Sequence, residues 1–175
     1  MTFEQAVYFK LLLICGFNDE LNDFVEKSLY EQTPISNIIM ELSMTQDEKK
    51  LLLVLNEYLR QINDEDIDYN IVFNYVLSFL RKMYTEEIMA KSELAGLMHK
   101  ISGYTERYTD EPWQTMFVLG SLYDEAESGY IEREEYLRQF DNFIMEGICL
   151  KDYPNSSPKE SFFKKIIRFF IPYKS

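Results

Sequence analysis

An all-α fold, in the form of an irregular multi-helix bundle of about eight helices, is predicted by three properties of this sequence. Apolar residues recur at the i, i+3 and i+4 spacing of one helix face along nearly the whole chain. No segment alternates apolar and polar residues as a strand does, and no Asn-Gly or Asp-Gly hairpin turn occurs. Glycine and proline are scarce, at 6 and 5 residues of 175, whereas β-rich folds need many tight turns.

Four helices are expected in the first half of the chain. Their starts carry N-terminal signals at Thr2 with Gln5, Asn18, Thr33–Pro34, and Thr45 with Glu48. Gly16 is the expected end of the first helix, because glycine adopts the left-handed conformation that follows many helices. The side chains expected to face the core include Val7 and Leu11, Leu21 and Val25, Ile38 and Ile39, and Leu51 and Leu55.

Four further helices are expected after an acid-rich turn at residues 63–68. The first is long and carries the apolar residues between Ile71 and Met83 on one face. The expected starts of the other three are Ser92, Pro112 and Glu132, and the expected ends of the last two are Gly129 and Gly147.

Charge divides the chain into two parts. Residues 1–150 hold 28 acidic and 12 basic residues, and residues 151–175 hold 2 acidic and 6 basic residues. We therefore expect an acidic helical domain over 1–150, followed over 151–175 by a linker and a basic amphipathic C-terminal helix. This helix is expected to dock on the domain. Contact of residues 162–171 with an anionic membrane is the less favoured alternative, because the membrane would repel the acidic domain.

The net charge of −12 limits the possible partners. An acidic surface repels nucleic acid and attracts basic proteins, with fast and salt-sensitive association. The first residues lack the basic start and cleavage site of a secretory signal, so a cytoplasmic location is expected. In that compartment Cys15 and Cys149, both in apolar surroundings, are expected to be buried reduced thiols.

No pattern in the sequence predicts an enzyme. The common motifs of hydrolases, nucleotide-binding loops and zinc proteases are absent, and no cofactor or metal is expected. The single histidine, His99, has no readable catalytic partner, so it is expected to be an ordinary helix-surface or partly buried residue.

Residues 124–135 resemble the calcium loop of an EF-hand. Asp124, Gly129 and Glu135 stand where such a loop needs a first ligand, its glycine and its closing glutamate. Ala126, however, offers no oxygen at the third position. The favoured interpretation is a helix–turn–helix in which Gly129 ends one helix and Ile131 packs back onto it.

Acidic clusters flanked by aromatic residues are the predicted partner-binding surface. Acids at helix starts suit the helix dipole, but a charge excess this large also costs stability through self-repulsion, which a basic partner would relieve. The predicted partner-binding residues are Asp64, Glu65, Asp66, Asp68, Asp110, Glu111, Trp113, Asp124, Glu125, Glu127, Tyr130 and Glu132.

In overall build the chain resembles the small, acidic, all-helical immunity proteins that accompany bacterial toxins, including those of contact-dependent growth inhibition. The resemblance implies a non-enzymatic protein that neutralises a basic, nuclease-type toxin with carboxylates placed where nucleic-acid phosphates would bind. Two alternatives stay open. One is an acidic secretion chaperone or adaptor with a hydrophobic groove, and the other is a degenerate EF-hand-like calcium-responsive protein.

Overall fold

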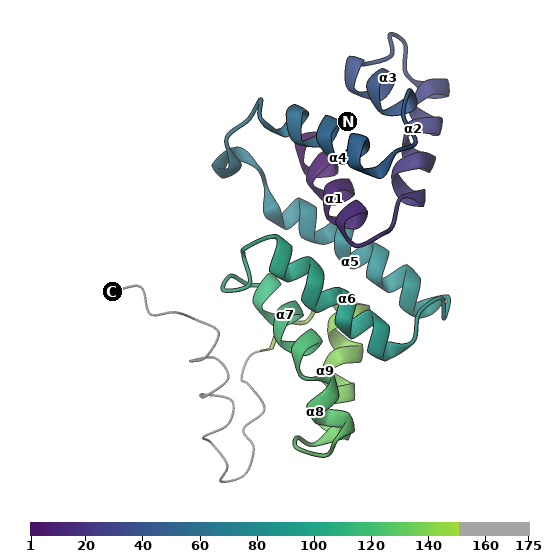
Figure 1. The fold of residues 1–175 in the computed structure, drawn as a ribbon. Coiled ribbons are helices and arrows are strands. Elements are labelled where there is room, and N and C mark those ends of the chain that lie inside the picture. The colour runs from purple at the N-terminus through teal and green to yellow at the C-terminus, as the bar shows by residue number, and fades with distance from the viewer. Residues whose placement is uncertain (151–175) are drawn as a thin grey trace.

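The computed structural model describes residues 1–150, and within this range the chain is all-helical, with no strand (Figure 1). The predicted all-α fold is confirmed. The elements are α1 (Phe3–Ile14), α2 (Asp19–Glu31), α3 (Asn37–Ser43), α4 (Glu48–Leu59), the short 3-10 helix η1 (Asp64–Asp66), α5 (Tyr69–Thr85), α6 (Lys91–Tyr104), α7 (Trp113–Ser121), α8 (Tyr123–Glu127) and α9 (Arg133–Glu146). The proposed linker and basic helix at 151–175 lie outside the described residues.

Helix α5 is the central element of the structure. Figure 1 shows α1–α4 on one side of α5 and α6–α9 on the other. Helix α1 packs against α4 and α5, while α5 also contacts α6 and α9. Within residues 1–150, no helix is both long enough and apolar enough to cross a bilayer.

The predicted ends of the first and last described helices are confirmed. The Gln5 backbone N–H donates to Thr2 Oγ1 (3.2 Å), and the Thr2 N–H donates to Gln5 Oε1 (2.9 Å), which completes a capping box. Gly16 follows α1 with φ 90°, and Gly147 ends α9 with φ 72°. Both glycines adopt the left-handed conformation that a side chain would disfavour.

The predicted capping box of α4 at Thr45 and Glu48 is wrong. The N-cap is Asp47, whose Oδ1 accepts from the Lys50 backbone N–H at 3.0 Å. Thr45 instead accepts from the Asp47 N–H, so it stabilises the turn before the helix. Aspartate competes well for the N-cap position, and its charge also favours the positive end of the helix dipole.

Two other predicted starts are misplaced. Helix α3 begins at Asn37 rather than at Thr33–Pro34, because a proline suits a bend as well as a first helical turn. Ser92 lies inside α6, which begins one residue earlier, and Glu93 accepts from the Ala90 backbone N–H at 3.0 Å.

Two further expectations on helix ends need correction. Asn18 precedes α2, but its side chain makes no capping hydrogen bond. The helix expected from Pro112 to Gly129 is divided at Leu122 into α7 and α8. Leu122 is itself buried, which directs the chain around the end of the core.

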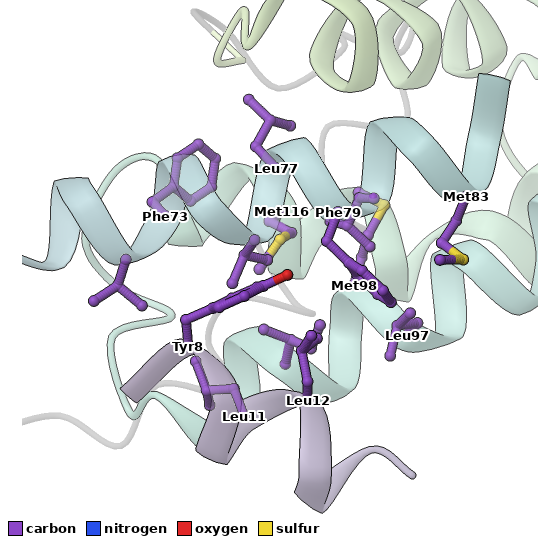
Figure 2. Close-up of a cluster of buried hydrophobic side chains, with 14 of the residues drawn as sticks. Tyr8, Leu11, Leu12, Phe73, Leu77, Phe79, Met83, Leu97, Met98 and Met116 are labelled. Carbon is purple, nitrogen blue, oxygen red and sulfur yellow. The ribbon is translucent and has the colours of Figure 1, made fainter. Parts of the chain in front are cut away.

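The core is continuous through the centre of the molecule. Figure 2 shows side chains of α1, α5, α6 and α7 converging, among them Leu12, Phe79, Met98 and Met116. Leu12, Met98 and Met116 are fully buried. Burying such a side chain contributes roughly 1.5–3 kcal/mol, so this cluster fixes how the two halves meet at α5.

Helices α6 and α7 approach each other closely at Gly120. A Cβ atom at this position would lie 2.6 Å from the Ala95 carbonyl oxygen and 2.6 Å from the His99 backbone nitrogen. Beside this contact, His99 Nδ1 lies 2.8 Å from Ser121 Oγ, which itself donates to the Phe117 carbonyl. The hydroxyl hydrogen is therefore engaged, so His99 donates through Nδ1.

We predict opposite effects for two glycine-to-alanine substitutions. Gly120→Ala should lower the free energy of unfolding by about 1–3 kcal/mol, because the two helices must separate to admit the methyl group. Gly96→Ala is the matched control, since nothing lies within 4 Å of a Cβ there and the helical backbone is similar. It should raise the unfolding free energy by about 0.5–1 kcal/mol. Urea unfolding of both variants measures the difference, and equal effects would contradict the close approach.

Candidate functional site

Two of the predicted acidic clusters meet at Arg107. Its Nη2 lies 2.9 Å from Asp64 Oδ2, and its Nη1 lies 3.9 Å from Asp110 Oδ2. Arg107 and Asp64 are 43 residues apart, and they belong to the α4–α5 and α6–α7 connections, which lie on the same side of the molecule (Figure 1). Tertiary structure thus joins clusters that are separate in sequence.

Tyr69 completes the contact between these connections. The Arg107 guanidinium carbon lies 3.8 Å from the centre of the Tyr69 ring, and the Tyr69 hydroxyl donates to Asp64 Oδ1 at 2.6 Å. Burial, with the hydrogen bond to Asp64 as the next cause, raises the pKa of Tyr69 to about 12. Tyr69 is the first residue of α5, where Asp68 accepts from the Asn70 N–H and fixes the start of the helix.

The end of α6 sets the direction of Arg107. Glu106 has φ 57°, so the chain makes a left-handed turn immediately after the helix. Thr105 supports this turn, because its hydroxyl donates to the Ser102 carbonyl (2.7 Å) and accepts from the Arg107 N–H (3.3 Å). The turn directs the guanidinium back toward Asp64 and not toward solvent.

We call residues 64–68 and 106–111 the acidic face. Its carboxylates are all exposed, and Arg107 is its one cation. The seven acids are Asp64, Glu65, Asp66, Asp68, Glu106, Asp110 and Glu111. Because Arg107 is only 30% exposed and faces inward, the charge presented to a partner is strongly negative.

A pocket of about 190 Å³ borders the acidic face. Its floor is apolar and comes from α1, the end of α4 and the connection to α5. The polar and aromatic edge consists of Lys10, Asp64, Tyr69, Tyr104 and Thr105. The lining apolar residues are Val7, Leu11, Ile14, Leu59, Ile62 and Ile67. Apolar floors beside charged rims are the usual build of protein-interaction sites.

Trp113 does not belong to this surface, so its prediction as a partner-binding residue is wrong. It is 2% exposed and packs edge-on against Phe73 of α5, with ring centres 5.2 Å apart. As the first residue of α7, it points into the core next to the acidic connection. Sequence position beside Asp110 and Glu111 could not reveal this direction.

The remaining predicted cluster, at residues 124–132, is separate from the acidic face. Figure 1 places α8 at the far end of the α6–α9 half, away from the α4–α5 connection. Glu127 already accepts from Arg133 (2.8 Å), and one carboxylate oxygen of Glu125 is buried. Asp124, Tyr130 and Glu132 are exposed, with Tyr130 at 76%.

The structure does not support the calcium-loop interpretation of residues 124–135. The first four of these residues lie in α8, so their backbone cannot wrap around an ion. Across the described residues, no group of three or more His, Cys, Asp or Glu is placed to hold a metal ion. Gly129 has φ 74° and Ile131 packs against the core, as the helix–turn interpretation predicted.

The thiols and the histidine are not arranged as reactive groups in the described part of the chain. Cys15 and Cys149 are free and only half-buried, not fully buried as expected. Burial raises the pKa of both thiols, which opposes thiolate formation. His99 lies partly buried between α6 and α7, over the Phe117 ring, with a centroid distance of 4.5 Å.

Sequence reasoning missed a second surface feature, a groove of about 430 Å³ between α1, α2 and α5. We call it the aromatic groove, because five aromatic side chains line it. These are Tyr8, Phe9, Phe24, Tyr75 and Phe79. Helical spacing places Phe24, Tyr75 and Phe79 on apolar helix faces, and nothing in this spacing predicts that α2 and α5 leave a gap between them.

The fold and these surfaces define an all-α protein with an acidic face and an aromatic groove. Comparisons with protein-family models, with curated proteins and with solved structures found no match to the chain.

We predict that Arg107→Met lowers the free energy of unfolding by about 1–2 kcal/mol, from the lost ion pairs and the lost contact with Tyr69. Without the arginine, the carboxylates of Asp64, Asp110 and their neighbours repel one another, which adds to this loss at low salt. Arg60→Met is the control, because Arg60 is exposed and makes no ion pair within residues 1–150. It should change stability by less than about 0.5 kcal/mol. Urea unfolding at two salt concentrations tests both expectations.

The raised pKa of Tyr69 predicts a pH dependence. The pKa of Tyr69 is about 12 in the folded state, above the value near 10 of an unfolded tyrosine. The stabilisation that neutral Tyr69 contributes is therefore complete below pH ~10 and is lost as the pH rises toward 12. In Tyr69→Phe, the fall in unfolding free energy between pH 10 and 12 should be shallower than in the unaltered protein. The variant should keep part of the fall, because burial also raises the pKa values of Tyr8 and Tyr136. Identical slopes would contradict the Tyr69–Asp64 contact.

Proposed function

We propose that this chain is a non-enzymatic binding protein whose acidic face binds a basic protein. The observation that carries the proposal is that Arg107 pairs with Asp64 and Asp110 and so joins two distant connections, which together carry seven exposed carboxylates. Like charges brought together in this way lower the stability of the free protein, and a basic partner would relieve that cost.

Helix dipoles account for only part of the acidic face. Asp68 caps α5, and Asp64 is held by Arg107 and Tyr69, so these two have structural roles. Glu65 and Glu106 are exposed and have no ion-pair partner among the described residues. These free carboxylates are available to lysine and arginine side chains of a partner.

The proposed partner class is a basic, nuclease-type toxin domain, which makes this chain an immunity protein acting in the cytoplasm. Such a domain binds nucleic acid through exposed cations, and carboxylates can occupy the places of the phosphates. The neighbouring pocket would accept an apolar side chain of the toxin, with half-exposed Tyr104 at its edge as an anchor. Charge would then govern the association rate, and the pocket would slow dissociation.

A second candidate function is that of an adaptor or chaperone for another protein. It is favoured by large apolar side chains exposed on the consecutive helices α2–α4. Tyr30 is 83% exposed, Met44 at the end of α3 is 75% exposed, and Leu53 is 55% exposed. An adaptor of this kind is expected to dimerise, so analytical ultracentrifugation separates the two candidates.

We predict that Glu65→Lys with Asp66→Lys weakens binding to a basic toxin domain encoded beside this chain by at least about tenfold at low salt. The reason is reversal of two exposed charges in the acidic face. Glu41→Lys with Glu146→Lys is the matched control, since it makes the same charge change on α3 and α9, and it should reduce binding far less. Surface plasmon resonance across a salt series measures both. Failure of the unaltered protein to bind or protect against any such toxin would reject the proposal.

A further inference from the structure

The aromatic groove has a continuous aromatic wall. Ring contacts run from Tyr75 to Tyr8 (5.6 Å), from Tyr8 to Phe9 (5.1 Å) and from Phe9 to Phe24 (5.0 Å). Tyr8, Phe9 and Phe79 form the buried floor, while Phe24 and Tyr75 are half-buried at the sides. Its volume, about 430 Å³, falls within the roughly 300–1,000 Å³ of clefts that hold ligands.

Helix α2, which forms one side of the groove, is acidic overall, with five acids and one base. Helix α2 places Glu20 and Asp23 in the lining and carries Asp19 and Glu26 nearby. Two bases, Lys27 and Lys82, also line the groove, but Lys82 is paired with Glu20 at 2.9 Å. Asp23 and Glu86 also lie close enough to Lys82 to contribute to the rise of its pKa. The two acids and two bases of the lining balance, so the negative field beside the groove comes from the other acids of α2, and a basic ligand fits this field.

The chain itself contains a ligand of the matching kind. Residues 162–171 present, at helical spacing, Phe162, Phe163, Ile166, Ile167 and Phe170 on one side and Lys164, Lys165 and Arg168 on the other. Large apolar side chains would enter an aromatic floor, while the three bases would meet the acids of α2.

The intervening chain is long enough for this contact. Eleven residues, 151–161, separate Leu150 from Phe162, and an extended chain of this length reaches about 36–40 Å. A domain of 150 residues has a radius of gyration of about 15 Å. The segment can therefore reach the groove from the end of the described structure.

From this match of shape, aromatic character, charge and reach, we propose that residues 162–171 of this chain bind in the aromatic groove between α1, α2 and α5. The groove and its ligand are independent of the acidic face, so the two proposals can fail separately. Docking closes an apolar surface that would otherwise attract other chains or lipid.

Hydrogen-exchange mass spectrometry of the full chain tests this docking. Amides of residues 162–171 should exchange at least about tenfold more slowly than in a free chain, at a rate that does not depend on protein concentration. Ser78→Lys should abolish the protection, because Ser78 is an exposed groove residue and a lysine there both fills the groove and repels the bases. Asn74→Lys is the control, since Asn74 is exposed on the same helix but does not line the groove, and it should retain the protection.

A photo-crosslinker gives a second readout that does not depend on the Ser78 variant. With p-benzoylphenylalanine in place of Ile167, crosslinks should map to residues 5–27 and 75–82 of the same chain. Free-chain exchange rates in the unaltered protein, equal protection in Ser78→Lys, or crosslinks to other helices or to a second copy would each overturn the proposal. Protection that arises only with vesicles containing anionic lipid would identify a membrane as the ligand and would also overturn it.

Discussion

The close approach of α6 and α7 at Gly120 is the constraint on which the acidic face depends. A backbone contact that excludes even a methyl group fixes the distance between these helices, and the His99–Ser121 hydrogen bond lies next to it. The connection that carries Arg107 joins the opposite ends of the same two helices, so their packing against each other limits where it can lie. A site built on a loop is as well placed as the elements that anchor it, and here the anchors are rigid.

The second support of the acidic face is α5, which begins at Tyr69 and runs through the centre of the core. Arg107 links the two supports by stacking on Tyr69 and pairing with Asp64. Each exposed ion pair contributes only about 0.2–1 kcal/mol, so Arg107 does not hold the fold together by itself. Its stronger effect is local, because it pairs with Asp64 and Asp110 from the inner side and leaves the other carboxylates of the acidic face unneutralised.

Local signals in the sequence predicted the features that depend on residues close in the chain, namely the helices and some of their ends. The helical spacing predicted the all-α fold, and the Thr2–Gln5 and Gly147 signals predicted the ends of two helices. The acidic turns were also predicted, but their meeting was not, because the Arg107–Asp64 pair spans 43 residues and arises from packing of α5 against α6. The prediction that Trp113 binds a partner was wrong for the same reason. Its neighbours in sequence are acidic and exposed, whereas its neighbours in space are core aromatics. The aromatic groove escaped prediction because a gap between packed helices has no sequence signature.

An acidic domain attracts every basic ligand, so charge alone cannot assign each ligand to its place. Long-range attraction is weakly selective and is screened within about 8 Å at physiological salt. The choice between the two surfaces then rests on apolar contacts, which differ between them. The aromatic groove offers a wall of rings that suits a phenylalanine-rich segment, whereas the pocket beside the acidic face is smaller and its apolar floor is aliphatic. A helix with several large aromatic residues would bury more apolar area in the groove, which leaves the acidic face open to a separate basic protein.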